Sequence, residues 1–306
     1  VNKMKKSNQI SLTYFYIILL MGSTVSCSND DNIAGFNRAY VSIPDSSFEA
    51  ILIKTGVDSD GIINQQMLSS DAEGITTLDL SNLEYGAITD LTGIEGFTSI
   101  RKLIATQHDI AQIDLSDNLN LDTLNLAGNK LLSIDISNIS KLVLLDLTAN
   151  EMNSVVGLSE LGELKDLDLS WNYFETFSIS SESLEVLHMS NNDLYSLDIS
   201  SAPNLKNLLL TSNKLQSLEV ISNKKLETLL VSDNELQTIN LLENNDLTHL
   251  YITSNSLDRL NVSFNQNLID LKVDRNPNLS CIKVLDGQNI PQISKSDHQE
   301  LNADCN

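Results

Sequence analysis

The main pattern along the chain is a short phrase of leucines and polar residues that returns about every 21 residues. Residues 205–215 read Leu-x-x-Leu-x-Leu-x-x-Asn-x-Leu, and the phrase begins again at Leu226, Leu247 and Leu268. Earlier copies begin, at steps of 20 to 25 residues, at Ile75, Ile100, Leu121, Leu142, Leu164 and Leu184. A fixed period of this length is the sequence signature of stacked repeats. The sequence therefore predicts about ten copies of one unit between residues 75 and 280.

Each copy predicts one short β-strand followed by a turn. Alternate side chains of Leu208-Leu209-Leu210 face inward, which is the period of a strand. Asn holds the ninth position in eight of the ten copies, and a buried Asn bonds backbone groups that a sharp turn leaves unpaired. His108 holds this position in the second copy, and we expect it to bind the backbone there. One copy cannot bury its own leucines, so the copies are expected to stack.

The second half of each unit alternates as well. Ile113-Asp114-Leu115-Ser116 and Leu197-Asp198-Ile199-Ser200 place every other apolar residue on one side. No stripe of apolar residues at the spacing of a helix is present in these segments. The back of the stack is therefore expected to be strand-like too.

These phrases resemble the bacterial leucine-rich repeats of about 21 residues. Residues 88–97 and 155–161 resemble internalin-type units, whose backs form short 3₁₀ turns. The resemblance implies a β-rich, right-handed leucine-rich-repeat solenoid. Its short parallel strands would line the concave face, its convex side would be strand-like or 3₁₀, and a small helical cap would cover its N-terminal end.

Both ends of the repeat region resemble the caps of secreted bacterial leucine-rich-repeat proteins. Residues 43–56 predict a capped helix, with Asp or Ser at the N-cap, an apolar face and Gly56 as terminator. A second short helix is predicted over residues 64–69. Residues 41–74 thus form the expected N-terminal cap. Residues 281–306 resemble the C-terminal cap, in which two cysteines clip the last turn.

The first 26 residues have the layout of a signal peptide, with a basic start, an apolar run and small residues. The small residues before Cys27 resemble a lipobox, although Thr24 replaces the usual Leu. The resemblance implies lipidation of Cys27, a tether over residues 27–40, and an outer-membrane lipoprotein on the surface of a Gram-negative cell. An ordinary signal peptide with an incidental Cys is the alternative.

The chain holds three cysteines, an odd count. If Cys27 carries lipid, Cys281 and Cys305 are left to pair with each other. Export permits such a disulfide.

The formal net charge of −22 narrows the class of partner. Such a charge argues against nucleic acid and against electrostatic docking on anionic lipid. Contact with a membrane is therefore expected through the N-terminal lipid only. Basic or neutral partners are favoured, and we expect a monomer.

No motif for catalysis or for a cofactor is present in the sequence. The four histidines are dispersed, and no phosphate-binding loop or nucleophile elbow occurs. Asp58 and Asp60 match the middle of an EF-hand calcium loop, but its first and twelfth positions fall on Gly56 and Met67, which cannot coordinate through their side chains. An Asx turn explains the same residues. We expect a protein that is not an enzyme and holds no metal.

The concave face is the candidate binding surface, because the third and fifth residues of each phrase point out of the inner sheet. Its middle is acidic, with Asp146, Asp166 and Asp168, and beyond it an exposed apolar and aromatic run is expected. This run comprises Val186, His188, Leu209, Leu230, His249 and Tyr251, with Trp171 and Tyr173 at the rim.

Exposed apolar clusters mark contacts, and Trp and Tyr are frequent at binding hot spots. The first hypothesis is therefore a protein or peptide ligand. The second is a carbohydrate stacked on Trp171, Tyr173 and Tyr251, and the third is a passive spacer.

Overall fold

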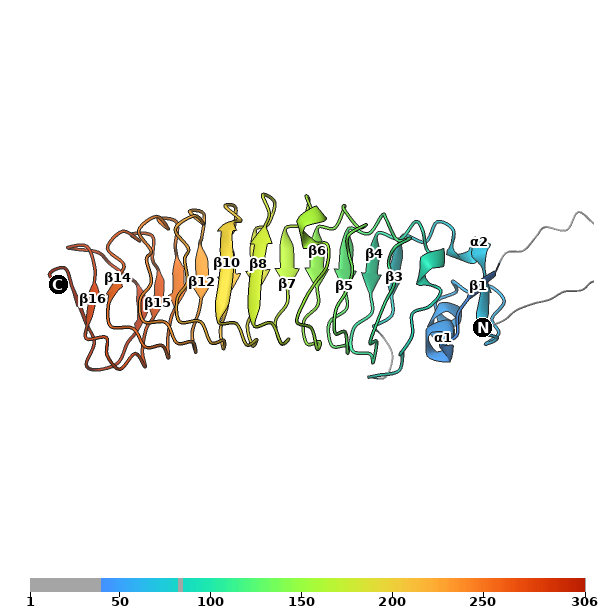
Figure 1. Ribbon diagram of the computed structural model, residues 1–306, viewed down its shortest axis with the longest axis horizontal. Helices are drawn as coiled ribbons and strands as arrows, with labels where there is room; N and C mark the ends of the chain where they lie inside the picture. Colours follow the sequence, from blue (N-terminus) through green and yellow to red (C-terminus); the bar gives the residue numbers. More distant parts are fainter. Residues whose placement is uncertain (1–39, 82–84, 306) are drawn as a thin grey trace, which may run out of the picture. The chain divides into compact units, whose positions relative to one another are not determined.

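Eleven short parallel strands form one continuous sheet along the stack of repeats (Figure 1). The computed structural model describes residues 40–81 and 85–305; the expected signal peptide and Cys27 lie outside these residues. The strands are β3 (Thr77–Asp79), β4 (Lys102–Ile104), β5 (Thr123–Asn125), β6 (Leu144–Asp146), β7 (Asp166–Asp168), β9 (Val186–His188), β11 (Asn207–Leu209), β12 (Thr228–Leu230), β13 (His249–Tyr251), β15 (Asp270–Lys272) and β17 (Gln292–Ser294). The predicted parallel-strand solenoid is thus confirmed.

The leucine in the middle of each strand stacks directly on the next. Leu208 pairs with Leu229, and Leu229 pairs with Leu250, and all three are fully buried. Burying one Leu contributes about 1.5–3 kcal/mol, so the column is the main source of cohesion between turns. The sheet continues one strand further than expected, because β17 lies within the segment assigned to the C-terminal cap.

After each concave strand the chain turns sharply at the eighth position of the phrase. This residue has a positive φ in nine consecutive turns, namely at Gln107, Gly128, Ala149, Trp171, Asn191, Ser212, Asp233, Ser254 and Arg275. The next residue is the ninth-position Asn, and we call the column of these Asn side chains the ladder. Asn213, for example, donates from Nδ2 to the carbonyls of Met189 and Leu210 and accepts from the N–H of Leu194. The predicted role of Asn as a turn ligand is confirmed.

His108 takes the place of Asn in the second turn. It is almost fully buried, and its Nε2 lies 3.1 Å from the carbonyl oxygen of Leu80. This contact confirms that His108 binds the backbone.

A second row of buried amides, which the sequence analysis missed, lies at the opposite corner of the turns. Asn118, Asn223, Asn244 and Asn265 each donate from Nδ2 to two backbone carbonyls. Gln288 ends the row with bonds to the carbonyls of Val262 and Asn265. The signal was present as Asn-x-x-Leu before several copies of the phrase. Two rows of amides therefore hold each of these turns closed.

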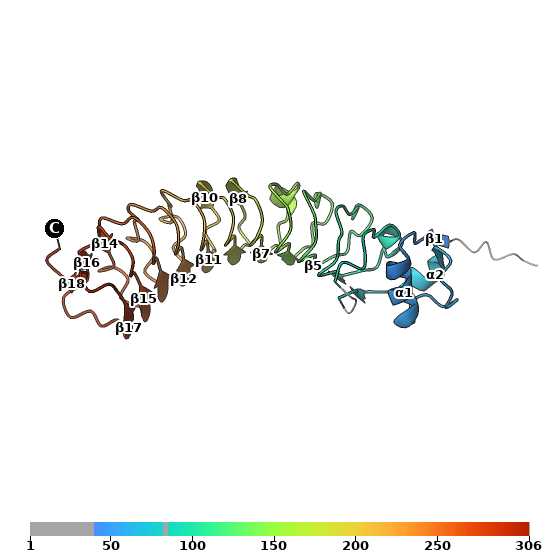
Figure 2. The same cartoon turned by 90° about the horizontal axis from the view of Figure 1, so that it is seen from below.

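The convex side is only partly strand-like. Its strands are β8 (Thr176–Ser180) with β10 (Ser196–Ser201), and β14 (Leu260–Asn261) with β16 (Cys281–Lys283) and β18 (Glu300–Asn302). The two predicted 3₁₀ turns are confirmed as η1 (Ile94–Gly96) and η2 (Leu158–Glu160). Figure 2 shows β5, β7 and β11 on the inner side of the curve and β8 and β10 on the outer side.

Gly157 is required where η2 begins. Its φ is +94°, and a Cβ there would collide with the backbone of Ser137 in the preceding turn. The tighter convex turn therefore depends on a residue without a side chain.

The N-terminal cap consists of β1 (Tyr40–Ser42), α1 (Ser46–Lys54), β2 (Gln66–Leu68) and α2 (Ser69–Ala72). The prediction of α1 is confirmed, with Asp45 as N-cap. Its Oδ2 also accepts from the N–H of Thr89, which ties the cap to the first repeat.

The helix predicted over residues 64–69 is wrong. The N–H groups of residues 64–66 donate to the buried carboxylate of Glu49, and Gln66–Leu68 pair with β1. Partners distant in the sequence thus override the local preference.

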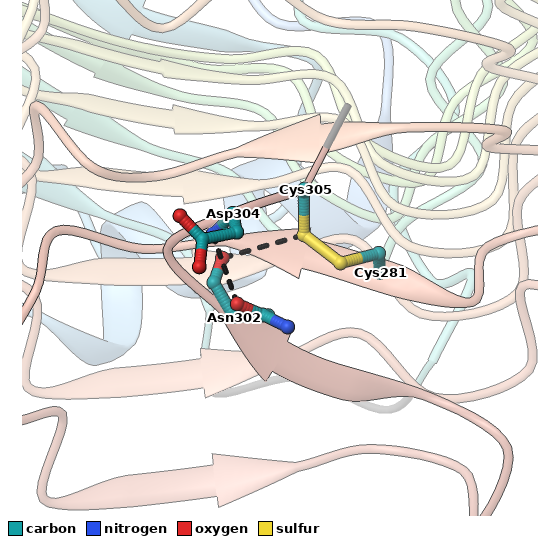
Figure 3. The surroundings of a disulfide bond; sticks show 4 residues. All are labelled: Cys281, Asn302, Asp304 and Cys305. Carbon is teal, nitrogen blue, oxygen red and sulfur yellow. Dashed lines mark hydrogen bonds between the residues drawn. A yellow bond between two sulfur atoms is a disulfide. The ribbon is translucent and has the colours of Figure 1, made fainter.

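The C-terminal end is closed by a disulfide between Cys281 on β16 and Cys305 after β18, with Cα atoms 5.8 Å apart (Figure 3). The N–H of Asp304 donates to the side chain of Asn302 and completes the last turn. The pairing inferred from the sequence is confirmed.

Candidate functional site

The outward positions of the inner sheet form a surface that no other part of residues 40–81 and 85–305 covers. In each of the seven strands of this sheet from β5 to β13 the middle residue is buried and its two neighbours are half-buried. Because side chains alternate along a strand, these neighbours all point to the concave side. This concave face carries nine of the candidate residues: Asp146, Asp166, Asp168, Val186, His188, Leu209, Leu230, His249 and Tyr251.

An acidic cluster with one histidine occupies the middle of the concave face. Register places Asp146 beside Asp168 and Asp168 beside His188, on strands β6, β7 and β9. The Nδ1 of His188 lies 3.1 Å from Oδ2 of Asp168. Asn125 donates to Asp146 over 2.9 Å. The cluster therefore consists of two hydrogen-bonded pairs that lie side by side on four adjacent strands.

The members of the cluster titrate differently. The hydrogen bond that His188 donates to Asp168, and the charge of Asp168, raise the pKa of His188 although burial opposes this. Burial favours the neutral form of Asp168, but the bonds from His188 and Ser170 outweigh it and lower the pKa of Asp168. Burial raises the pKa of Asp166, and the charges of Asp168 and Asp146 add to the effect. The pKa of Asp166 is thus raised while that of Asp168 is lowered, so Asp166 protonates more easily than Asp168.

The stabilisation from the His188–Asp168 pair is expected to be greatest between pH 3.8 and 6.5, the ordinary pKa values of the two groups. Below 3.8 the stabilisation is lost as pH falls through the lowered pKa of Asp168. Above 6.5 it is lost as pH rises through the raised pKa of His188. Comparing the unfolding of the wild type and His188→Gln from pH 3 to 9 measures this window. An NMR titration that places the pKa of His188 at or below 6.5 would contradict it.

The apolar half of the concave face differs from the expectation. Val186, Leu209, Leu230 and Tyr251 are half-buried rather than exposed, because side chains on adjacent strands cover one another. Tyr251 also has partners of its own: its hydroxyl donates to Asp270 over 2.6 Å, and Nζ of Lys272 lies 3.7 Å from its ring centroid. This half of the face is therefore a partly desolvated surface on which Tyr251 is held in place by its partners.

The remaining candidates, Trp171 and Tyr173, lie outside the concave strands. They follow β7 in the turn at the edge of the sheet, and their side chains are 61% and 59% exposed. Tyr195 in the next turn is 58% exposed, and the sequence analysis missed it. Tyr173 is the tenth residue of its repeat and Tyr195 the twelfth of the next. Both belong to the alternating positions that face outward, and this alternation was the signal that could have found Tyr195. We call Trp171, Tyr173 and Tyr195 the aromatic edge.

The backbone of Trp171 is strained. Its φ is +58°, a conformation that costs a residue with a Cβ about 1–2 kcal/mol. Most other turns place Gly, Ala, Asn, Ser or Asp at this position. The conformation itself recurs in all nine turns and belongs to the repeat, so what sets Trp171 apart is the exposed aromatic ring that this position carries.

The two calcium candidates are engaged in local turns. Oδ1 of Asp58 accepts from the N–H of Asp60, and Oδ1 of Asp60 accepts from the N–H of Ile62. The geometry is that of Asx turns. Among the described residues no three His, Cys, Asp or Glu side chains are grouped to hold a metal ion.

A hollow of about 730 Å³ lies along the second, third and fourth turns, at the edge opposite the aromatic edge. Arg101 and Asp122 line it and form an ion pair of 2.7 Å. Lys141 in the same wall donates to Asn120. Arg101 and Lys141 are thus each bonded to a neighbouring side chain of the wall.

The helices in the described part of the chain are all too short or too polar to cross a membrane.

Comparison with known proteins identifies the fold. No family model matches the chain, and a search of curated proteins finds no match. Solved structures do match. The functional domain of InlJ from Listeria monocytogenes is 24% identical with a TM-score of 0.70, and the match covers 87% of this chain and 62% of that one.

Two further solved structures with leucine-rich repeats or an internalin fold match the chain. The leucine-rich-repeat domain of APL1 is 22% identical, with a TM-score of 0.60 and coverage of 76% of this chain and 65% of that one. Internalin C2 from Listeria monocytogenes is 22% identical, with a TM-score of 0.52 and coverage of 70% and 86%. The chain thus spans less than two thirds of the InlJ and APL1 domains. It has the leucine-rich-repeat fold of the internalins, a parallel-strand solenoid of about eleven turns.

Proposed function

We propose that the chain is a non-enzymatic scaffold that binds a protein partner through its concave face. The observation that carries the proposal is the change of chemistry along that face. Asp146, Asp166 and Asp168 form an acidic middle, and Leu209 and Leu230 follow two and three strands later. Carboxylates beside apolar groups suit a partner with basic side chains next to an apolar anchor.

The size of the face fits this role. Strands spaced roughly 4.8 Å apart give the ten spacings of an eleven-stranded sheet a length of about 48 Å. A standard protein interface needs about 800 Å² on each partner. The face also carries side chains held in place by bonds, such as His188 to Asp168 and Tyr251 to Asp270. Fixed side chains lower the entropic cost of binding.

The proposal includes the location of the protein. The resemblance of residues 1–27 to a lipoprotein signal supports export and attachment by lipid at Cys27, and the internalin-like fold supports display at a cell surface. Metabolic labelling with a clickable palmitate analogue tests the attachment: label is expected on the wild type and absent from Cys27→Ser. Protease shaving of intact cells tests whether the repeats face outward.

The binding test uses the purified chain and a partner recovered by crosslinking on intact cells. Changing Leu209 and Leu230 to Asp together is expected to raise the Kd at least 30-fold, because truncating a hot spot costs 2 kcal/mol or more. Surface plasmon resonance measures the Kd.

Leu242→Asp is the matched control, because Leu242 is 42% exposed and lies outside the concave strands. An unchanged Kd for the Leu209/Leu230 variant would overturn the proposal and leave the spacer hypothesis. So would an equal loss in the control.

A further inference from the structure

The aromatic edge is separate from the concave face and has its own composition. Residues alternate between buried and exposed through this edge: Asn172 and Phe174 are buried, whereas Trp171, Tyr173 and Glu175 are exposed. The next turn repeats the pattern, so Asn191, Asp193 and Tyr195 share the outward side. The three aromatic rings therefore lie on two adjacent turns, which are roughly 4.8 Å apart.

Small or polar side chains surround the three rings. The same outward positions hold Ala149, Glu151 and Asn153 in the preceding turn, and Ser212, Lys214 and Gln216 in the following one. Lys214 is paired with Asp193 over 2.6 Å. A protein hot spot usually lies in a well-packed, desolvated pocket, whereas these three rings are exposed. Isolated rings among carboxylates and amides instead match a sugar, whose C–H face stacks on an aromatic ring while its hydroxyls donate to acceptors.

The edge is also rigid. The N–H of Trp171 donates to Ser190 over 2.9 Å, that of Tyr173 to Met152 over 2.8 Å, and that of Tyr195 to Glu175 over 2.9 Å. Each ring is thus mounted on backbone that is bonded to a neighbouring turn. A fixed backbone lowers the entropic cost of binding.

We propose that Trp171, Tyr173 and Tyr195 form a binding site for a neutral oligosaccharide. The carboxylates of Glu151 and Glu175 accept hydrogen bonds from its hydroxyl groups. The same carboxylates, on a chain of net charge −22, repel glycans that carry uronate or sulfate. The strained backbone of Trp171 is retained because its ring is part of this site.

Trp171 is the only Trp of the chain, so its fluorescence reports on the site directly. The probes are hexaoses of glucose in α-1,4, β-1,4 and β-1,3 linkage, of mannose, xylose and N-acetylglucosamine, and hexagalacturonate as the acidic control. A saturable change of emission is expected with at least one neutral hexaose and none with hexagalacturonate. Tyr173→Ala and Tyr195→Ala should each weaken binding roughly 3- to 10-fold. Tyr85→Ala is the control, because Tyr85 is 75% exposed and lies in another turn.

Trp171→Asn separates a binding role from a structural one, because Asn191 already occupies this position in the next turn. The variant is expected to lose sugar binding in calorimetry while its Tm rises by about 2–4 °C as strain is relieved. The inference is overturned if no neutral hexaose changes the emission, if Trp171→Asn still binds, or if the Tm falls. It is also overturned if the edge variants weaken the protein partner and not the sugar. Only the Leu209/Leu230 variant bears on the proposed function.

Discussion

Replacing Asn192 by Ala is expected to lower the free energy of unfolding by about 3 kcal/mol. Oδ1 of Asn192 accepts from the N–H of Phe174 over 3.1 Å, and Nδ2 donates to the carbonyls of Leu169 and Met189 over 3.0 and 3.1 Å. Asn192 is buried, so water cannot replace these bonds. An orphaned buried group costs about 1–3 kcal/mol, and the variant orphans a donor and weakens two acceptors.

Urea unfolding followed by circular dichroism measures the loss. Asn204→Ala is the matched control, since both side-chain bonds of Asn204 are exposed: it donates to the carbonyl of Glu182 and accepts from Nζ of Lys225. The control is expected to lose about 0.5–1.5 kcal/mol. Equal losses in the two variants would show that the ladder adds nothing beyond an ordinary surface bond.

Removing the disulfide by changing Cys281 and Cys305 to Ser is expected to cost about 3–4 kcal/mol. The bond closes a loop of 24 residues, and opening it frees the unfolded chain. The damage is expected first at the end of the stack, because each turn contacts only its neighbours. Amide exchange is therefore expected to rise in β16 and β18 and to remain low in β5 and β6.

Dithiothreitol provides the control for this effect. It should destabilise the wild type and leave the double variant unchanged. If exchange in β16 and β18 is the same in the double variant and the oxidised wild type, the disulfide does not hold the end of the stack.

The stacked strands could be predicted because their signal is repeated. A single Leu-x-x-Leu is uninformative, but the recurrence from Leu121 to Leu268 determined both the strands and their register. The ninth-position Asn was read correctly for the same reason. The convex side was harder, because the alternation in residues 217–220 and 238–241 matches that of β8 and β10, yet no strand forms there. The curvature of the stack moves neighbouring turns apart on the convex side, which opposes strand pairing there. Curvature is a property of the whole stack, so the sequence of one turn does not predict it.

The candidate surface could be predicted only in part. The sequence placed Asp168, His188 and Leu209 on the concave face, which the register confirms. It could not give the half-burial of Leu209, because that depends on the side chains of adjacent strands. Tyr195 was missed because it lies in the second half of its unit. The alternation there was interpreted as the strand-like back of the stack, and its outward positions were not considered as a binding surface.

The ladder also makes the length of the molecule adjustable. Asn213 bonds the N–H of Leu194, and Asn234 bonds that of Leu215 in the same way. Excising residues 213–233 would bring Asn234 to the place that Asn213 leaves, with the leucine column still in register. Duplication or deletion of whole turns in the gene can therefore lengthen or shorten the concave face without a redesign of the interior.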